Sequence, residues 1–256
     1  MSFNPVRSIR KYLMSSLKDS PWFYRLSFLE KSLIRCVLQI QSWMDGSYFY
    51  WIMKPKEGFR SQFGQDFVFQ ELGIARTPGF FVEVGCNHPE IESNTFILEK
   101  VFGWTGIAID PLDYSSDFRT LRAKTTFINC LVLNELKKVE FFKVSNIDGW
   151  QNRMSSIFES ELKNSKFLYK KVEVDSVPLR LLIPVGQKVD LILLDVEGAE
   201  IDVLDSLNWD LHSPIHILVE NTGRLESRRK LNRYLKGRGY RLLARIGFSD
   251  QLWKIS

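Results

Sequence analysis

The chain has 256 residues, of which 45% are hydrophobic, 13% aromatic and 25% charged. These proportions match an ordinary globular domain and exclude a disordered, collagen-like or disulfide-stapled chain. The formal net charge of +5 is unevenly distributed: Lys/Arg against Asp/Glu counts are 10 to 4 in residues 1–60, 15 to 24 in residues 61–223, and 9 to 1 in residues 224–245. An acidic middle between basic ends fits a neutral or cationic small ligand better than a nucleic acid.

The cysteines and the hydropathy pattern bear on the cellular compartment. Cys36, Cys86 and Cys130 are widely spaced and form no CxxC pair, which favours a reducing compartment and argues against a zinc site. No uncharged apolar run approaches the ~20 residues that a membrane-spanning helix needs, and the first residues lack the apolar core of a signal peptide. We therefore expect a cytoplasmic protein, which its basic ends could hold at the inner face of a membrane.

Residues 1–58 are predicted to form a basic helical segment that ends near Pro55 and Gly58. Apolar residues recur along one helical face at steps of three and four, namely Leu26, Leu29, Leu33, Val37, Ile40 and Met44. A face this apolar usually needs protein to cover it, so the favoured interpretation is a cap that packs on the main domain. The alternatives are a helix lying on an anionic membrane surface and a homo-oligomer formed through the same face.

Residues 59–256 are predicted to form one α/β domain, because short apolar runs alternate with amphipathic stretches. Strands are expected at residues 79–85, 105–110, 125–131, 139–144, 171–175, 189–195, 215–220, 240–246 and 251–255. Helices are expected at residues 62–72, 94–102, 199–207 and 228–237. Strands that are apolar throughout indicate a parallel sheet covered by helices on both faces.

Polar residues at the carboxyl ends of these strands mark the predicted site, because ligands of open parallel sheets bind at that edge. They are Glu83 with Gly85, Asp110, Asn129, Asp195 with Glu197, and Glu220 with Asn221. Acids that face one crevice repel one another and lose hydration unless a cation, hydroxyls or amines compensate them. Such a crevice suits a ligand with a ribose diol and a positive charge, and it suits a pyrophosphate poorly.

The loop after the first of these strands distinguishes between two kinds of nucleotide cofactor. A dinucleotide-binding loop needs G-x-G-x-x-G to bring backbone close to two phosphates, whereas this loop is Gly85-Cys86-Asn87-His88-Pro89-Glu90. S-adenosylmethionine carries no phosphate, and its sulfonium and ammonium groups suit an acidic crevice. Asp110, 25 residues after Gly85, is placed to accept hydrogen bonds from the ribose hydroxyls, and Glu83 to orient the methionine end.

Four motifs carry a family resemblance. They are SQFGQDFVF at residues 61–69, GFFVEVGCNHPEIESNT at 79–95, GWTGIAIDP at 103–111 and VDLILLDVEGAEIDVL at 189–204. Together they resemble the FkbM-type methyltransferases over roughly residues 61–255. The resemblance implies a Rossmann-like, seven-stranded class I methyltransferase sheet, S-adenosylmethionine as donor, and O-methylation, frequently of sugar hydroxyls. Asn87, His88 and Pro89 stand where the usual loop has its second and third glycines.

The expected cofactor-binding and catalytic residues follow from these positions. The cofactor set is Glu83, Gly85, Asn87, Ser93, Asn94, Thr95, Asp110, Asn129 and Asp195. Free backbone N–H groups where Asn94 and Thr95 open a helix could hold the methionine carboxylate. Asp195 and Glu197 are candidate general bases for the acceptor hydroxyl, and His88 is a third. The alternative role of Glu197 is to stabilise the first turn of the next helix.

A metal site is a further hypothesis. Asp195, Glu220 and Asn221 would supply hard oxygen ligands to Mg²⁺, an arrangement that resembles metal-dependent O-methyltransferases. The alternative is that Glu220 caps the following loop or pairs with a basic residue such as Arg224.

The sequence thus predicts an S-adenosylmethionine-dependent O-methyltransferase that acts on a hydroxyl of a sugar or glycan, including a lipid-linked one. The alternatives are a methyltransferase for a non-sugar small molecule or an amine, and a non-catalytic protein that keeps the methyltransferase fold as a binding scaffold. Retention of acids around the crevice, among them Glu83, Asp110 and Asp195, argues against the scaffold.

Overall fold

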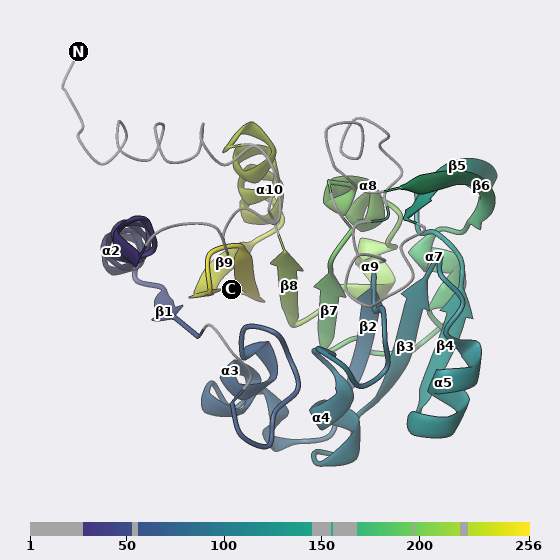
Figure 1. Ribbon diagram of the computed structural model, residues 1–256, viewed down its shortest axis with the longest axis horizontal. Helices are drawn as coiled ribbons and strands as arrows, with labels where there is room; N and C mark the ends of the chain where they lie inside the picture. Colours follow the sequence, from purple (N-terminus) through teal and green to yellow (C-terminus); the bar gives the residue numbers. More distant parts are fainter. Residues whose placement is uncertain (1–27, 53–55, 145–154, 156–167, 197, 221–224) are drawn as a thin grey trace.

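A computed structural model describes residues 28–52, 56–144, 155, 168–196, 198–220 and 225–256 (Figure 1). The strands are β1 Tyr48–Tyr50, β2 Phe80–Val84, β3 Thr105–Asp110, β4 Thr125–Asn129, β5 Lys137–Val144, β6 Tyr169–Ser176, β7 Leu191–Leu194, β8 His216–Glu220, β9 Tyr240–Ile246 and β10 Asp250–Ile255. The helices are α2 Phe28–Asp45, α3 Gln65–Glu71, the 3₁₀ helix η2 Ile74–Arg76, α4 Phe96–Lys100, α5 Ser115–Leu121, α7 Leu179–Leu182, α8 Glu200–Asp205, α9 Trp209–His212 and α10 Leu225–Gly237.

One eight-stranded sheet forms the centre of the fold, with strand order β1-β9-β10-β8-β7-β2-β3-β4. All neighbouring pairs are parallel except those of β10, which runs antiparallel to both β8 and β9. Helices α8 and α10 cover one face, and α3, α4 and α5 lie on the other (Figure 1). The predicted α/β class is confirmed, and the seven strands expected from the resemblance are present as β2–β4 and β7–β10.

The eighth strand comes from the N-terminal segment. Helix α2 confirms helical structure for residues 28–45, but Tyr48–Tyr50 extends the sheet by pairing with β9, Phe49 opposite Arg245. Consecutive aromatic residues fit a pleated strand better than a helix, which explains this difference from the helical expectation. The helical expectation for residues 1–27 lies outside the described residues, and the division of the chain near residue 58 stays a prediction.

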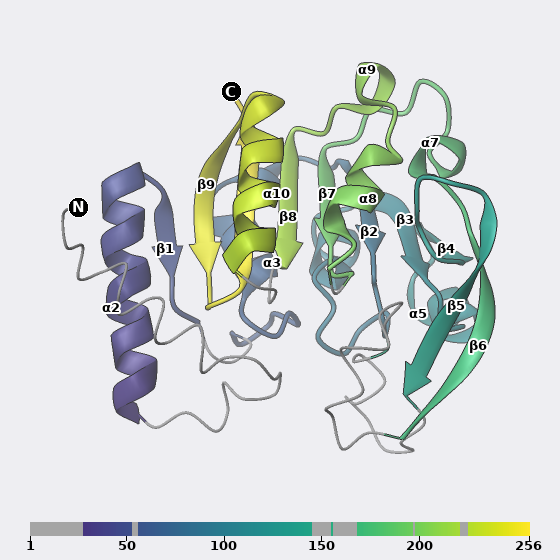
Figure 2. The same cartoon turned by 90° about the horizontal axis from the view of Figure 1, so that it is seen from above.

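The apolar strands are buried because successive side chains point to opposite faces of a sheet that is covered on both sides. On β2, Val82 and Val84 pack in the cluster that contains Leu231 and Leu235 of α10. Phe81 packs in the cluster that contains Val68 and Phe69 of α3. Strands β5 and β6 are separate from this sheet and form their own antiparallel pair (Figure 2). Most of their charged side chains are exposed, whereas Phe141, Phe142 and Val144 are buried.

Arg122 is the centre of a buried polar network beneath the loop that follows β2. The residue is 1% exposed, and its Nε atom lies 2.9 Å from Oε2 of Glu99. The same guanidinium donates to the carbonyl oxygen of Pro89 at 2.9 Å and to Oγ1 of Thr95 at 3.0 Å. Because these partners come from the loop, α4 and its start, Arg122 fixes their position against the sheet.

We expect Arg122→Met to lower the free energy of unfolding by about 3–5 kcal/mol, because it leaves the Glu99 carboxylate buried without its partner. Urea unfolding of wild type and variant measures this difference. Arg119→Met, one turn earlier on the exposed side of α5, is the matched control and should stay within about 0.5 kcal/mol of wild type. Equal stability of both variants would contradict a structural role for the network.

Candidate functional site

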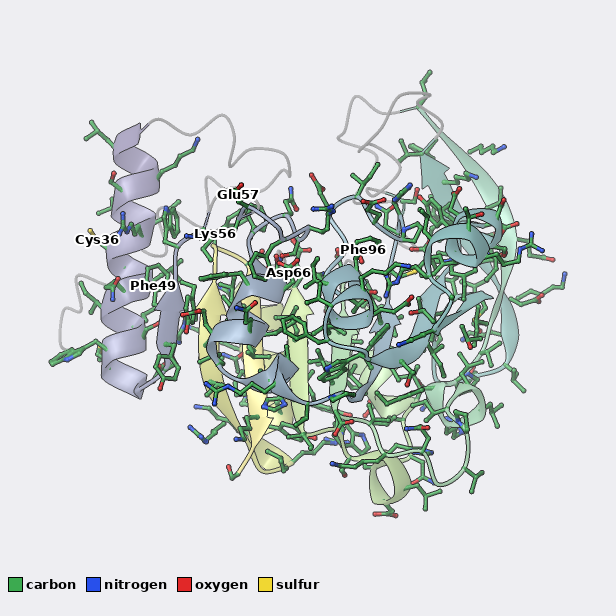
Figure 3. All side chains as sticks on the ribbon, turned by 90° about the horizontal axis from the view of Figure 1, so that it is seen from below. Cys36, Phe49, Lys56, Glu57, Asp66 and Phe96 are labelled. Carbon is green, nitrogen blue, oxygen red and sulfur yellow. The ribbon has the colours of Figure 1, made fainter. Side chains whose placement is uncertain are left out.

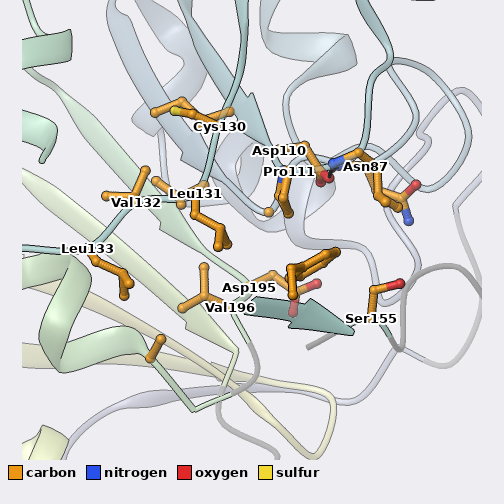
Figure 4. Close-up of a pocket in the computed structure, with 16 residues that line it drawn as sticks. Asn87, Asp110, Pro111, Cys130, Leu131, Val132, Leu133, Ser155, Asp195 and Val196 are labelled. Atoms are coloured by element: carbon orange, nitrogen blue, oxygen red, sulfur yellow. Dashed lines mark hydrogen bonds between the residues drawn. The ribbon is translucent and has the colours of Figure 1, made fainter. Parts of the chain in front are cut away.

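A cavity opens at the carboxyl ends of β2, β3, β4 and β7 (Figure 4). Its apolar wall includes Ile109, Leu131, Val132, Phe141 and Val196. Its polar groups are Asn87, Asp110, Ser155 and Asp195. A flat apolar group with a polar, hydroxyl-bearing neighbour fits such a lining.

Asp110 ends β3 and presents a buried carboxylate to this cavity. Its Oδ2 accepts from the backbone N–H of Asn87 at 2.9 Å, and its Oδ1 accepts from that of Leu112 at 2.8 Å. Burial raises the pKa of Asp110 to about 6 in spite of these two bonds, and the nearby Asp195 charge adds to the rise. Each oxygen has a further lone pair, so the fixed carboxylate can accept from two adjacent hydroxyls.

The turn after β2 depends on two left-handed backbone conformations. Gly85 has φ +80°, and a Cβ at this position would overlap the carbonyl oxygen of Asp195. Asn87 has φ 51°, a conformation that Asn tolerates better than most residues. Its Oδ1 accepts from the Tyr114 hydroxyl at 2.7 Å. Asn87 therefore adopts a conformation that glycine usually provides, and the turn forms without the second and third glycines of the usual loop.

A second, smaller cavity shares Val84, Gly85 and Asp195 with the first and is strongly polar. Glu83, Glu220, Asp250 and Asn94 also line it. Glu83 accepts from Thr95 Oγ1 at 2.6 Å, and Thr95 in turn accepts from Arg122. Burial raises the pKa of Glu83 to about 7, even though the bond from Thr95 lowers it.

Gln65 and Asp250 complete this small cavity, and neither is among the site residues predicted from the sequence. Gln65 Nε2 donates to Asp250 Oδ2 at 2.6 Å. Burial raises the pKa of Asp250 to about 7, with a further rise from Asp195. Asp250 is the first residue of β10 and pairs in register with Glu220. Since β10 is antiparallel, its amino end lies at the carboxyl edge of the other strands. An acid at the start of an antiparallel last strand is therefore the sequence signal that points to Asp250.

The structure brings most of the predicted site residues together. Gly85, Asn87, Asp110 and Asp195 line the larger cavity, whereas Glu83, Gly85, Asn94, Asp195 and Glu220 line the smaller one. Glu197 and Asn221 lie outside the described residues.

Four other predicted residues line neither cavity and bond to neighbouring loops and strand ends. His88 Nδ1 accepts from the backbone N–H of Glu90 at 3.1 Å and of Ile91 at 3.0 Å. Ser93 Oγ accepts from the N–H groups that open α4, Thr95 donates to Glu83, and Asn129 Nδ2 donates to the carbonyl oxygen of Asp110 at 2.9 Å. Each of them supports a neighbour of the cavities, and their assignment to cofactor or catalysis stays a prediction.

Of the three residues in the metal hypothesis, Asp195 and Glu220 are within the described structure and Asn221 is not. Asp195 and Glu220 line the same small cavity. Among the described residues, no group of three or more His, Cys, Asp or Glu side chains is arranged to hold a metal ion. A Mg²⁺ site at Asp195, Glu220 and Asn221 therefore stays a prediction.

A comparison with known protein families finds a match. A family model described as the methyltransferase FkbM domain matches residues 83–242, a range that includes every predicted site residue. A solved structure titled "Human methyltransferase 10 domain containing protein" is similar, with a TM-score of 0.39 and 11% sequence identity over 90% of this chain and 98% of that chain. A comparison with curated proteins gives no match.

The raised pKa of Glu83 makes stability depend on pH with a defined sign. The unfolded carboxyl ionises at its ordinary pKa of 4.5, whereas the folded one ionises at about 7. Between these values the folded state holds the extra proton, so the stabilisation is lost as pH rises. We expect Glu83→Gln to match wild type in unfolding free energy at about pH 4 and to exceed it by about 3 kcal/mol at about pH 8.

Denaturant unfolding of both proteins across this pH range provides the measurement. Glu71→Gln, at the exposed end of α3, is the matched control and should follow the wild-type curve. A pH-independent difference between Glu83→Gln and wild type would contradict the raised pKa.

Proposed function

The chain belongs to the FkbM methyltransferase family, and on that premise we propose that it transfers a methyl group from S-adenosylmethionine to a hydroxyl of a sugar or glycan. The observation that carries the cofactor proposal is the buried Asp110 carboxylate at the end of β3, held by two backbone N–H groups at the mouth of an apolar cavity.

The residues of the larger cavity fit S-adenosylmethionine by their chemistry. The apolar wall with Phe141, Ile109 and Val132 suits the adenine ring. Asp110 accepts from the ribose hydroxyls, and the acids beside Gly85, Glu83 and Asp195, attract the cationic methionine end. When bound, the cofactor supplies an electrophilic methyl group on its sulfonium sulfur.

The smaller cavity supports an acceptor rich in hydrogen-bond donors. Its acids Asp195, Glu220 and Asp250 accept hydrogen bonds when ionised. A sugar offers several hydroxyl donors and no negative charge that these groups would repel. Asp250, whose pKa burial raises to about 7, is suited to take a hydroxyl proton at neutral pH, because a general base works best near its own pKa.

An amine is the second candidate acceptor. The excess of carboxyl groups around the small cavity favours a cationic group as well as a hydroxylated one. A sugar and an amine differ in their need for a base. A hydroxyl must lose its proton to become a good nucleophile, whereas an amine in its neutral form attacks through its own lone pair.

The cofactor proposal predicts tight binding that depends on Asp110. Isothermal titration with S-adenosylmethionine and S-adenosylhomocysteine should show saturable binding by wild type and a loss of ~100-fold for Asp110→Ala, which removes two charge-assisted hydrogen bonds. Asp113→Ala, three residues later and fully exposed, should bind as wild type does. Failure of folded wild type to bind either compound would support the scaffold alternative instead.

The acceptor proposal predicts that Asp250→Asn slows methyl transfer. With labelled S-adenosylmethionine and a panel of sugars and amines, transfer should occur to sugar hydroxyls, and Asp250→Asn should lower its rate ~100-fold at neutral pH by removing the base. Asp202→Asn, exposed on α8, is the control. Parallel assays with a chelator test the metal hypothesis. Transfer to amines alone would contradict the sugar proposal, and an unaffected Asp250→Asn rate would contradict the role of Asp250 as the base.

A further inference from the structure

Helix α2 presents a wide apolar surface to solvent. The exposed fractions are 77% for Leu29, 41% for Leu33, 43% for Ile40, 84% for Trp43 and 72% for Met44. Steps of four, seven, three and one place these side chains on one face of the helix, and Cys36, exposed on the same face, points away from the molecule in Figure 3. Scattered exposed apolar residues are common, but a contiguous face of this kind marks an interaction surface.

The opposite face of α2 packs against the rest of the protein. Ile34 and Leu38 cluster with Phe49 of β1 and with Trp51, and Figure 3 shows Phe49 between α2 and the sheet. Arg245 of β9 forms an ion pair with Asp45 at the end of the helix. The apolar surface is therefore held in a fixed orientation and is not needed to attach α2 to the fold.

Charge distinguishes between the possible occupants of this surface. Residues 1–27, which precede it directly, contain five Lys/Arg and one Asp, a net charge of +4. On α10, which like α2 contacts β9, Arg229, Arg233 and Lys236 are exposed. A second copy of the chain would bring like charges together, whereas an anionic lipid surface complements both the charge and the apolar side chains.

We propose that α2 docks the protein on an anionic membrane surface, with Leu29, Leu33, Ile40, Trp43 and Met44 inserted at the level of the lipid headgroups and the flanking basic residues bound to lipid phosphates. Exposed Trp side chains favour that level of a bilayer. No helix in the described parts of the chain is long and apolar enough to cross a membrane.

The orientation of α2 relates this docking surface to the cavities. Strand β1 is parallel to β9, and β9 runs in the direction of β8 because both are antiparallel to β10. Helix α2 lies alongside β1 in Figure 2 and joins it through Gly46 and Ser47, so the Leu29 end lies toward the edge that carries Asp195 and Glu220. Docking on the outward face of α2 would therefore hold this edge, with its cavities, in a fixed orientation relative to the membrane.

Co-sedimentation of the full chain with vesicles tests the docking. We expect wild type to bind vesicles of phosphatidylcholine with phosphatidylserine and not those of phosphatidylcholine alone, and the binding to weaken with added salt. The double variant Ile40→Glu/Trp43→Glu should lose at least about tenfold in partitioning. Leu181→Glu/Leu211→Glu, exposed by 58% and 59% on α7 and α9, is the matched control and should bind as wild type does.

A third variant separates charge from apolar insertion. Arg7→Gln/Arg10→Gln/Lys11→Gln should weaken binding to the anionic vesicles about fivefold for each charge removed. Titration with S-adenosylmethionine should be the same for all variants, which verifies folding and makes failure of the docking distinguishable from failure of the proposed function.

Three results would overturn the proposal. The first is that wild type does not sediment with anionic vesicles. The second is that the α2 variant and the control variant bind equally. The third is a wild-type dimer, seen by light scattering after gel filtration, that Ile40→Glu/Trp43→Glu converts to a monomer, because a second copy would then cover the surface.

Discussion

The crowding of buried carboxyl groups at one edge of the sheet is the constraint on which the rest of this structure depends. Glu83, Asp110 and Asp250 are each at most 7% exposed, and burial raises the pKa of every one of them. Asp195 lines both cavities between them. Groups in this state are stable only if fixed donors surround them or a ligand compensates them.

The fixed donors come from outside the sheet. Thr95 at the start of α4 donates to Glu83, and Gln65 from α3 donates to Asp250. Arg122 holds Thr95 in turn, so a residue that touches neither cavity sets the position of a carboxyl group that does. The pKa values of Glu83 and Asp250 are still raised. The protein's own donors therefore offset only part of the free-energy cost of burying the ionised carboxylates. A cationic, hydroxylated cofactor would offset the rest of this cost through its charge and its hydrogen-bond donors.

Much of this arrangement could be predicted, because it follows from local rules. The strand expected at residues 105–110 has the observed bounds of β3, and its last residue, Asp110, lies in the cavity as a strand-end acid should. Gln65 and Arg122 could not be found that way. The polar role of each depends on a partner 23 to 185 residues distant in sequence, and no spacing rule connects such pairs. Likewise, the aromatic residues Tyr48–Tyr50 suit a strand, but the β9 edge with which they pair cannot be read from their own sequence.

The antiparallel strand β10 has two consequences that link the two ends of the chain. It reverses direction between β8 and β9, which brings Asp250 beside Glu220 and so adds an acid to an edge that parallel strands alone would leave less charged. It also makes β9 the outer strand, to which β1 and then α2 attach. The helix with the exposed apolar face and the acid-rich cavity are therefore positioned by one strand, and any surface that binds α2 lies at a fixed place relative to the site.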